Sequence, residues 1–210
     1  MANNYELSLQ IDPTELAVIS AAGMNITLAK PVGGAAPNVI WQSFDPFENN
    51  TVSWTEQYGI YAATSTVEHG ATISKLSTFS PAEGGSTYTF LPNAIFSQGV
   101  ATSDVPLTSY RIDNAMPASK YRALTFGLTQ PAIINGVPGG FNALNADMVL
   151  SQAYDTLTPF TVVYVWLQAN FASETMISQI NTSYTKVTFG GTVTSVSLKF
   201  NSASGTFVQS

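Results

Sequence analysis

Short segments in which apolar and polar residues alternate recur along the whole chain. In residues 5–11 every second residue is apolar, which is the pattern of a half-buried strand. Similar alternation occurs in residues 24–28 and 192–200, whereas residues 159–168 are apolar almost throughout. A continuous apolar run rich in valine and aromatic residues is typical of a strand covered on both faces. The pattern therefore predicts a protein built mainly from strands.

One segment carries helix signals instead. Asp12 can cap a helix, Pro13 suits its first position, and Glu15 completes a capping-box arrangement. Gly23 is placed to end the helix in the left-handed conformation. We expect a single short helix at about residues 13–22.

Gly, Pro and Asn separate the predicted strands, as they do in β-proteins with many turns. Short strands with one helix favour an all-β fold, either an antiparallel β-sandwich or a barrel-like sandwich. The length of 210 residues suits one all-β domain over residues 1–210, and the weak pattern in residues 92–118 leaves room for a subdomain boundary there. Residues 129–146 are rich in Gly and Pro and predict a long loop, whose role the sequence does not assign.

The most aromatic part of the chain is residues 37–63, which contain two of the three tryptophans, Trp41 and Trp54. Residues 38–44 and 51–63 have strand composition and flank a turn. The segment predicts a β-hairpin or a pair of adjacent strands, with an aromatic face and an acidic, amide-rich tip.

The composition narrows the classes of partner. Charged residues make up only 10% of the chain and apolar residues 45%, so Ser, Thr, Asn and Gln must solvate most of the surface. Such a surface favours neutral polar ligands such as glycans, or association between copies into a homo-oligomer. The net charge is −6 and no basic cluster occurs, which argues against nucleic acid as a partner.

The expected location is the cytoplasm. The chain has no cysteine, which favours a reducing compartment, and it starts without the basic and apolar regions of a signal peptide. Release by a route that needs no signal peptide stays open. No apolar run is long enough for a transmembrane helix.

Little in the sequence indicates catalysis. The single histidine, His69, precedes Gly70 in a predicted turn, and no nucleophile elbow or phosphate-binding loop occurs. One histidine and no cysteine leave no zinc site. Carboxylates of Asp45, Glu48 and Glu56 could act as a glycosidase pair, but the simpler interpretation, which we prefer, is that Asp45-Pro46 starts a turn and Glu48 is solvated. We therefore predict a protein that is not an enzyme, with no catalytic residue, no metal and no cofactor.

A ligand site is predicted where aromatic rings and amides meet, because sugars are bound by stacking and directed hydrogen bonds. The same tryptophans also suit the core. The tip at residues 45–50 supplies carboxylates and amides, and the following strand supplies the rings. The candidate ligand-binding residues are Asp45, Glu48, Asn49, Asn50, Trp54, Tyr58 and Tyr61.

These observations lead to three functional hypotheses. The first is a lectin-like, non-enzymatic binding protein for glycans. The second is a defence protein or toxin that assembles in membranes, because residues 182–208 alternate as amphipathic hairpins do, around a Gly190-Gly191 turn. The third is a self-assembling structural or storage protein. The ligand, the oligomeric state and any action on membranes are not determined by the sequence.

Overall fold

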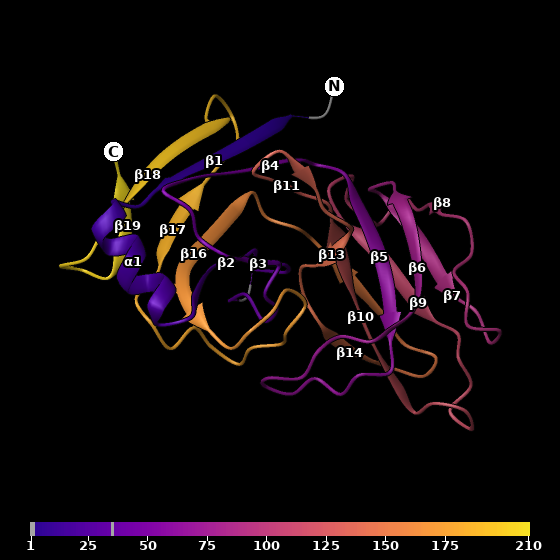
Figure 1. The fold of residues 1–210 in the computed structure, drawn as a ribbon. Helices are drawn as coiled ribbons and strands as arrows, with labels where there is room; N and C mark the ends of the chain where they lie inside the picture. Colours follow the sequence, from indigo (N-terminus) through magenta and orange to yellow (C-terminus); the bar gives the residue numbers. More distant parts are fainter. Residues whose placement is uncertain (1–2, 35) are drawn as a thin grey trace.

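The computed structural model describes residues 3–34 and 36–210, which fold mainly into β-strands. Several sheets, mostly antiparallel, pack together around a shared apolar core, and a single helix accompanies them in the described residues (Figure 1). The predicted all-β sandwich class is confirmed.

The largest sheet unites the two ends of the chain. Its strands, in spatial order, are β12 (Val137–Pro138), β11 (Ile133–Ile134), β4 (Asn49–Thr55), β1 (Asn4–Gln10), β18 (Ser195–Asn201) and β19 (Thr206–Gln209). Strands β1 and β18 lie side by side and run parallel (Figure 1), while the other pairs in this sheet are antiparallel. The alternation predicted for residues 5–11 is present in β1, where Tyr5, Leu7 and Leu9 are buried.

A second sheet is built around β5, which is covered on both faces. Its strands are β13 (Asn142–Ala143), β10 (Ala123–Gln130), β5 (Tyr58–Ala63) and β6 (Lys75–Ala82), and β14 (Asp147–Leu150) also pairs with β10. All six residues of β5 are buried. Tyr58 and Ile60 join the main core, whereas Tyr61 and Ala63 join a smaller cluster on the other face.

Two four-stranded sheets complete the architecture. One contains β15 (Tyr154–Leu157), β9 (Tyr110–Asn114), β7 (Ser86–Phe90) and β8 (Val100–Ala101), with β7 and β9 parallel. The other contains β17 (Thr185–Thr188), β16 (Val162–Ala169), β2 (Met24–Ala29) and β3 (Gln42–Phe44). The apolar run at residues 159–168 becomes β16, which pairs on both sides.

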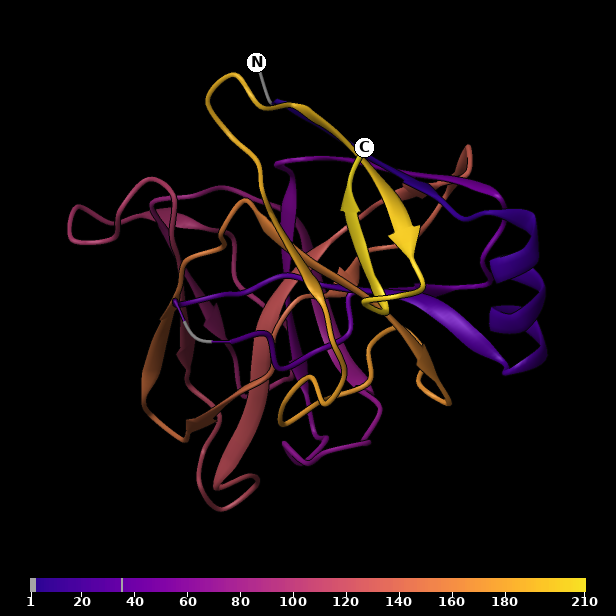
Figure 2. The same cartoon turned by 90° about the vertical axis from the view of Figure 1, so that its left-hand side faces the viewer.

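The helix forms where it was predicted, as α1 (Pro13–Ala21), at the edge of the molecule in both views (Figures 1 and 2). Gly23 adopts φ +62°, the left-handed conformation expected after a helix. The predicted capping box is absent, because the Asp12 side chain makes no cap hydrogen bond. Its carboxylate instead forms an ion pair with Lys199 at 2.9 Å.

The hairpin prediction for residues 37–63 is wrong. Strand β3 pairs with β2, β4 pairs with β1 and β11, and β5 pairs with β10 and β6. The expected strand at residues 51–63 is interrupted at Glu56 and Gln57, where the chain passes from one sheet to another. The three strands that residues 37–63 form therefore do not pair with one another.

The second predicted hairpin is also split between sheets. Gly190 and Gly191 form the expected turn, with φ +113° and +59°. The strands on either side diverge, because β17 pairs with β16 while β18 pairs with β1 and β19. Residues 129–146 are not a plain loop either, since they contain β11, β12 and β13.

Candidate functional site

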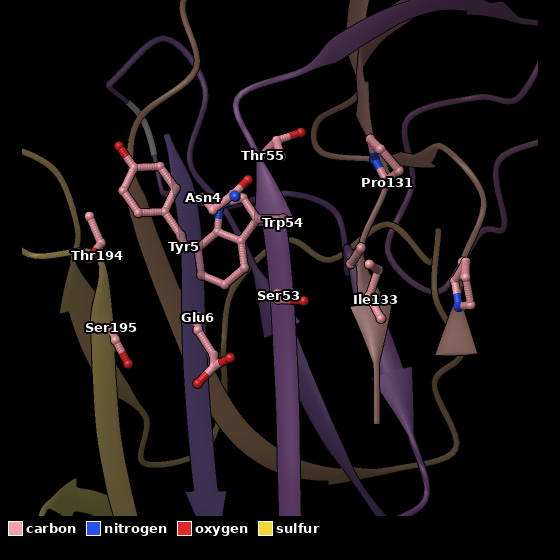
Figure 3. Close-up of a pocket in the computed structure, with 13 residues that line it drawn as sticks. Asn4, Tyr5, Glu6, Ser53, Trp54, Thr55, Pro131, Ile133, Thr194 and Ser195 are labelled. Atoms are coloured by element: carbon pink, nitrogen blue, oxygen red, sulfur yellow. The ribbon is translucent and has the colours of Figure 1, made fainter. Parts of the chain in front are cut away.

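A cleft of about 620 Å³ opens on the largest sheet (Figure 3). A row of paired residues crosses five strands at this point: Ser195 on β18 is opposite Glu6 on β1, which is opposite Ser53 on β4. Ser53 is in turn opposite Ile133 on β11, which is opposite Pro138 on β12. Because side chains on a paired row point to the same face of a sheet, this row forms one continuous strip along the cleft.

The strip is polar at one end and apolar at the other. Ser195, Glu6 and Ser53 provide two hydroxyls and a carboxylate, and Asn4 and Thr55 add further polar groups beside them (Figure 3). Ile133 and Pro138, with Pro131, provide the apolar wall. No Lys, Arg or His belongs to the lining formed by the described residues. The cleft therefore offers hydrogen-bonding groups and an apolar surface without a positive charge.

Aromatic rings lie directly beneath this strip, on the inner face of the sheet. Tyr5 and Trp54 are opposite one another on β1 and β4, and both are buried. Their rings pack at a centroid distance of 5.8 Å, and both contact the ring of Phe189. Trp41 meets Trp54 edge to face at 5.5 Å. The sequence alternation along β1 and β4 thus places rings inward and polar groups outward.

The rings enclose a lysine. Lys30, one residue after β2, is 1% exposed, and its Nζ lies 5.1 Å from the ring centroids of both Trp41 and Trp54. The Tyr58 ring is 6.0 Å away. Burial lowers the pKa of Lys30 to about 7, because a charged amine loses its hydration there, and the charge of Glu56 opposes this shift. The same burial raises the pKa of the Tyr58 hydroxyl.

The polar partner of the lysine is the side-chain amide of Gln130, the last residue of β10. Lys30 Nζ donates to Gln130 Oε1 at 2.6 Å, and Gln130 Nε2 donates to the backbone oxygen of Thr55 at 2.7 Å. The backbone oxygen of Gln130 accepts from Trp41 Nε1 at 2.9 Å. This network connects β2, β10 and the end of β4, and Thr55 also lines the cleft.

The structure does not bring the seven predicted ligand residues together. Asp45, Glu48 and Asn49 are exposed at the tip, whereas Asn50 is buried and bonds both the N–H and the oxygen of Phe47. Asn49 and Asn50 line a smaller hollow of about 340 Å³ with residues of β1 and β18. A ligand contact at this tip stays a prediction.

The three predicted aromatic residues lie in the interior. Trp54 and Tyr58 belong to the surroundings of Lys30, and of the seven predicted residues only Trp54 lines the cleft. Tyr61 is on the opposite face of β5, where its hydroxyl donates to the backbone oxygen of Asn145 at 2.6 Å. These rings are therefore positioned as core side chains, the alternative that the sequence left open.

The sequence reasoning missed Lys30, Gln130, Glu6 and Ile133. Two of them did have a signal, because Lys30 and Gln130 each stand at the end of a strand pattern, directly before a proline. A charged or amide residue at such a position is a candidate for a buried polar contact. Glu6 and Ile133 had none, since their proximity depends on the pairing of β1, β4 and β11.

His69 is exposed in its turn, and its Nδ1 accepts the backbone N–H of Ser178 at 3.1 Å. The hydroxyl of Ser178 is farther away, 3.4 Å from the same nitrogen. Among the described residues, no group of three His, Asp or Glu side chains is arranged to hold a metal ion. Within the same residues, no helix has the length and apolar character needed to cross a membrane.

Comparison of the chain with protein-family models, curated proteins and solved structures finds no match.

Proposed function

We propose that the protein is a non-enzymatic, lectin-like binding protein that holds a neutral polar ligand, such as a glycan, in the cleft over β18, β1, β4 and β11. The observation that carries the proposal is the strip from Ser195 to Pro138, polar at one end and apolar at the other. A sugar ring has hydroxyls along its edge and C–H groups on its faces, so it requires both kinds of surface side by side. The volume suits a small ligand, since binding clefts hold roughly 300–1,000 Å³.

The charge in the cleft supports the same class of ligand. Glu6 is the carboxylate among the lining residues, and the described lining contains no cation to oppose it. A carboxylate accepts hydrogen bonds from two neighbouring hydroxyls, which suits a sugar, whereas it repels phosphate and other anions. The cleft is thus proposed to select neutral, hydroxyl-rich ligands over anionic ones.

The proposal is tested by glycan-array binding followed by calorimetry on any glycan that binds. Ser195→Trp is designed to fill the cleft from an exposed position and should abolish binding. Thr78→Trp, at an exposed position on β6, is the matched control and should bind normally. Glu6→Gln should weaken binding about tenfold, which corresponds to the loss of one charged hydrogen bond, while Glu68→Gln, in an exposed turn, should not.

Two results would contradict the proposal. One is the absence of binding across a broad array by the folded wild-type protein. The other is binding that survives Ser195→Trp but disappears in Asn49→Ala, which would place the ligand at the tip instead.

A further inference from the structure

The amine of Lys30 and the carboxamide of Gln130 are in contact inside the protein, although the two residues are 100 positions apart. The Nζ–Oε1 distance is 2.6 Å, and the residues are 1% and 0% exposed. Water is therefore largely excluded from both groups. The proposed binding function leaves this pair without a role, because neither residue lines the cleft.

The carboxamide is held in one orientation. Gln130 Nε2 donates to the Thr55 oxygen at 2.7 Å, and the Gln130 main chain accepts from Trp41 Nε1 at 2.9 Å. On the other side, the rings of Trp41, Trp54 and Tyr58 confine the end of Lys30. Two reactive groups kept in contact by their surroundings behave as if at very high concentration.

The amine is also available as a nucleophile. An amine attacks a carbonyl carbon only in its uncharged form, and burial lowers the pKa of Lys30 to about 7. About half of the amine is then uncharged at neutral pH. Among the described residues no carboxylate lies within ion-pair distance of Lys30. Glu56 is the carboxylate whose charge raises the pKa of Lys30 against the effect of burial.

We infer that Lys30 and Gln130 join in an intramolecular isopeptide bond. The lone pair of Lys30 Nζ attacks the side-chain carbonyl carbon of Gln130, and a C–N bond forms. One proton passes from Nζ to Nε2, the old C–N bond breaks, and Nε2 leaves as ammonia. The product is a secondary amide between the two side chains. No electrons are gained or lost overall, and no other reactant is required.

The bond would connect two different sheets, because Lys30 directly follows β2 and Gln130 ends β10. It would also close a loop of 100 residues, and such a loop restricts the unfolded chain strongly. Thr55 and Pro131 border the reacting pair and line the cleft, so the cleft is the side on which ammonia would leave. The crosslink would hold the inner side of the cleft in place.

The test is the intact mass of the purified full-length protein, measured under denaturing conditions. The expected mass is lower than the sequence mass by one ammonia molecule, and fragment spectra of a tryptic digest should join the peptides that carry Lys30 and Gln130. Lys30→Met and Gln130→Met should each retain the full mass. Lys75→Met and Gln168→Met are matched controls and should still lose ammonia, because Gln168 bonds Trp166 and no lysine.

The intact mass of the folded wild-type protein is sufficient to test the inference, even if a variant does not fold. A full sequence mass after prolonged incubation at pH 8 would overturn the inference. So would an ammonia loss that the fragment spectra assign to an asparagine.

Discussion

Two lysines lie against the two faces of β5, and they have opposite surroundings. Lys30 is on the Tyr58 face, fully enclosed, with three aromatic rings and one neutral amide around its amine. Lys75 is on the Tyr61 face, with its Nζ 5.9 Å from that ring. It forms an ion pair with Glu174 and donates to the Phe141 oxygen at 2.7 Å.

The difference lies in how each site compensates for lost hydration. The side chains of Lys75 and Glu174 keep 19% and 22% of their exposure, so the charge retains a countercharge and some water. Lys30 has neither an ion-pair partner among the described residues nor contact with solvent. Rings and an amide dipole stabilise a cation less than a carboxylate and water do. The same residue type is therefore a conventional ion-pair partner on one face and a candidate nucleophile on the other.

The largest expected effect comes from opening the enclosure of Lys30. Trp41→Ala should lower the free energy of unfolding by about 3–5 kcal/mol, because it leaves a cavity and removes the donor to Gln130. Urea denaturation measures this loss. Tyr154→Ala is the control on an exposed ring and should change stability by at most about 1 kcal/mol, the value of its cation–π contact with Arg111. Equal losses in the two variants would mean that the enclosure contributes little.

Removing the polar partner of each lysine should lower the free energy of unfolding by different amounts. Measured against protein that has not formed the crosslink, Gln130→Ala leaves Lys30 Nζ and the Thr55 oxygen without their bonds, at a cost of about 3 kcal/mol. Against crosslinked protein the loss should be larger, because the crosslink also restricts the unfolded chain. Glu174→Ala, at the partly exposed site, also removes the acceptor of the Ala143 N–H and should cost about 1–2 kcal/mol. Chemical denaturation of both variants measures the two losses in the free energy of unfolding. A larger loss for Glu174→Ala would reverse the comparison.

The titration of Lys30 can be isolated in Gln130→Met, which cannot form the isopeptide bond. The folded-state pKa of Lys30 is about 7, below its ordinary value of 10.5. The unfolded chain therefore binds more protons between these values, and stability should rise with pH, by about 2 kcal/mol from pH 7 to 9. Tyr58 and Tyr110, whose pKa values burial raises, lose their protons above this range.

The control for this measurement is the double variant Lys30→Met with Gln130→Met, whose stability should lack the Lys30 contribution. Identical pH profiles for the single and double variants would show that Lys30 does not titrate in this window.

The smallest effect concerns salt. The Lys75–Glu174 pair is partly exposed, so 1 M NaCl should reduce the stability difference between wild type and Glu174→Gln by a few tenths of a kcal/mol. The difference between wild type and Gln130→Ala should not change, because ions do not reach Lys30. Denaturation in low and high salt compares the two. An equal salt response would indicate that solvent enters the Lys30 site.

Local patterns predicted the elements better than the contacts between them. Alternation located β1 and β2, and the Asp-Pro start with Gly23 located α1. Turn chemistry also placed the bend at Gly190 and Gly191. It failed to predict the pairing, because the strands on both sides of that turn have partners in different sheets.

The sequence by itself determined an all-β chain with one helix, a polar surface of low charge, and aromatic strands that need burial. These properties depend on residue type and local spacing. The tertiary structure alone decided that Ser195, Glu6, Ser53 and Ile133 share one cleft. It also decided that Lys30 meets Gln130, because that contact requires β2 and β10 to be packed through a core assembled from all four sheets. Contacts between distant segments depend on the packing of the whole chain, which local patterns do not encode.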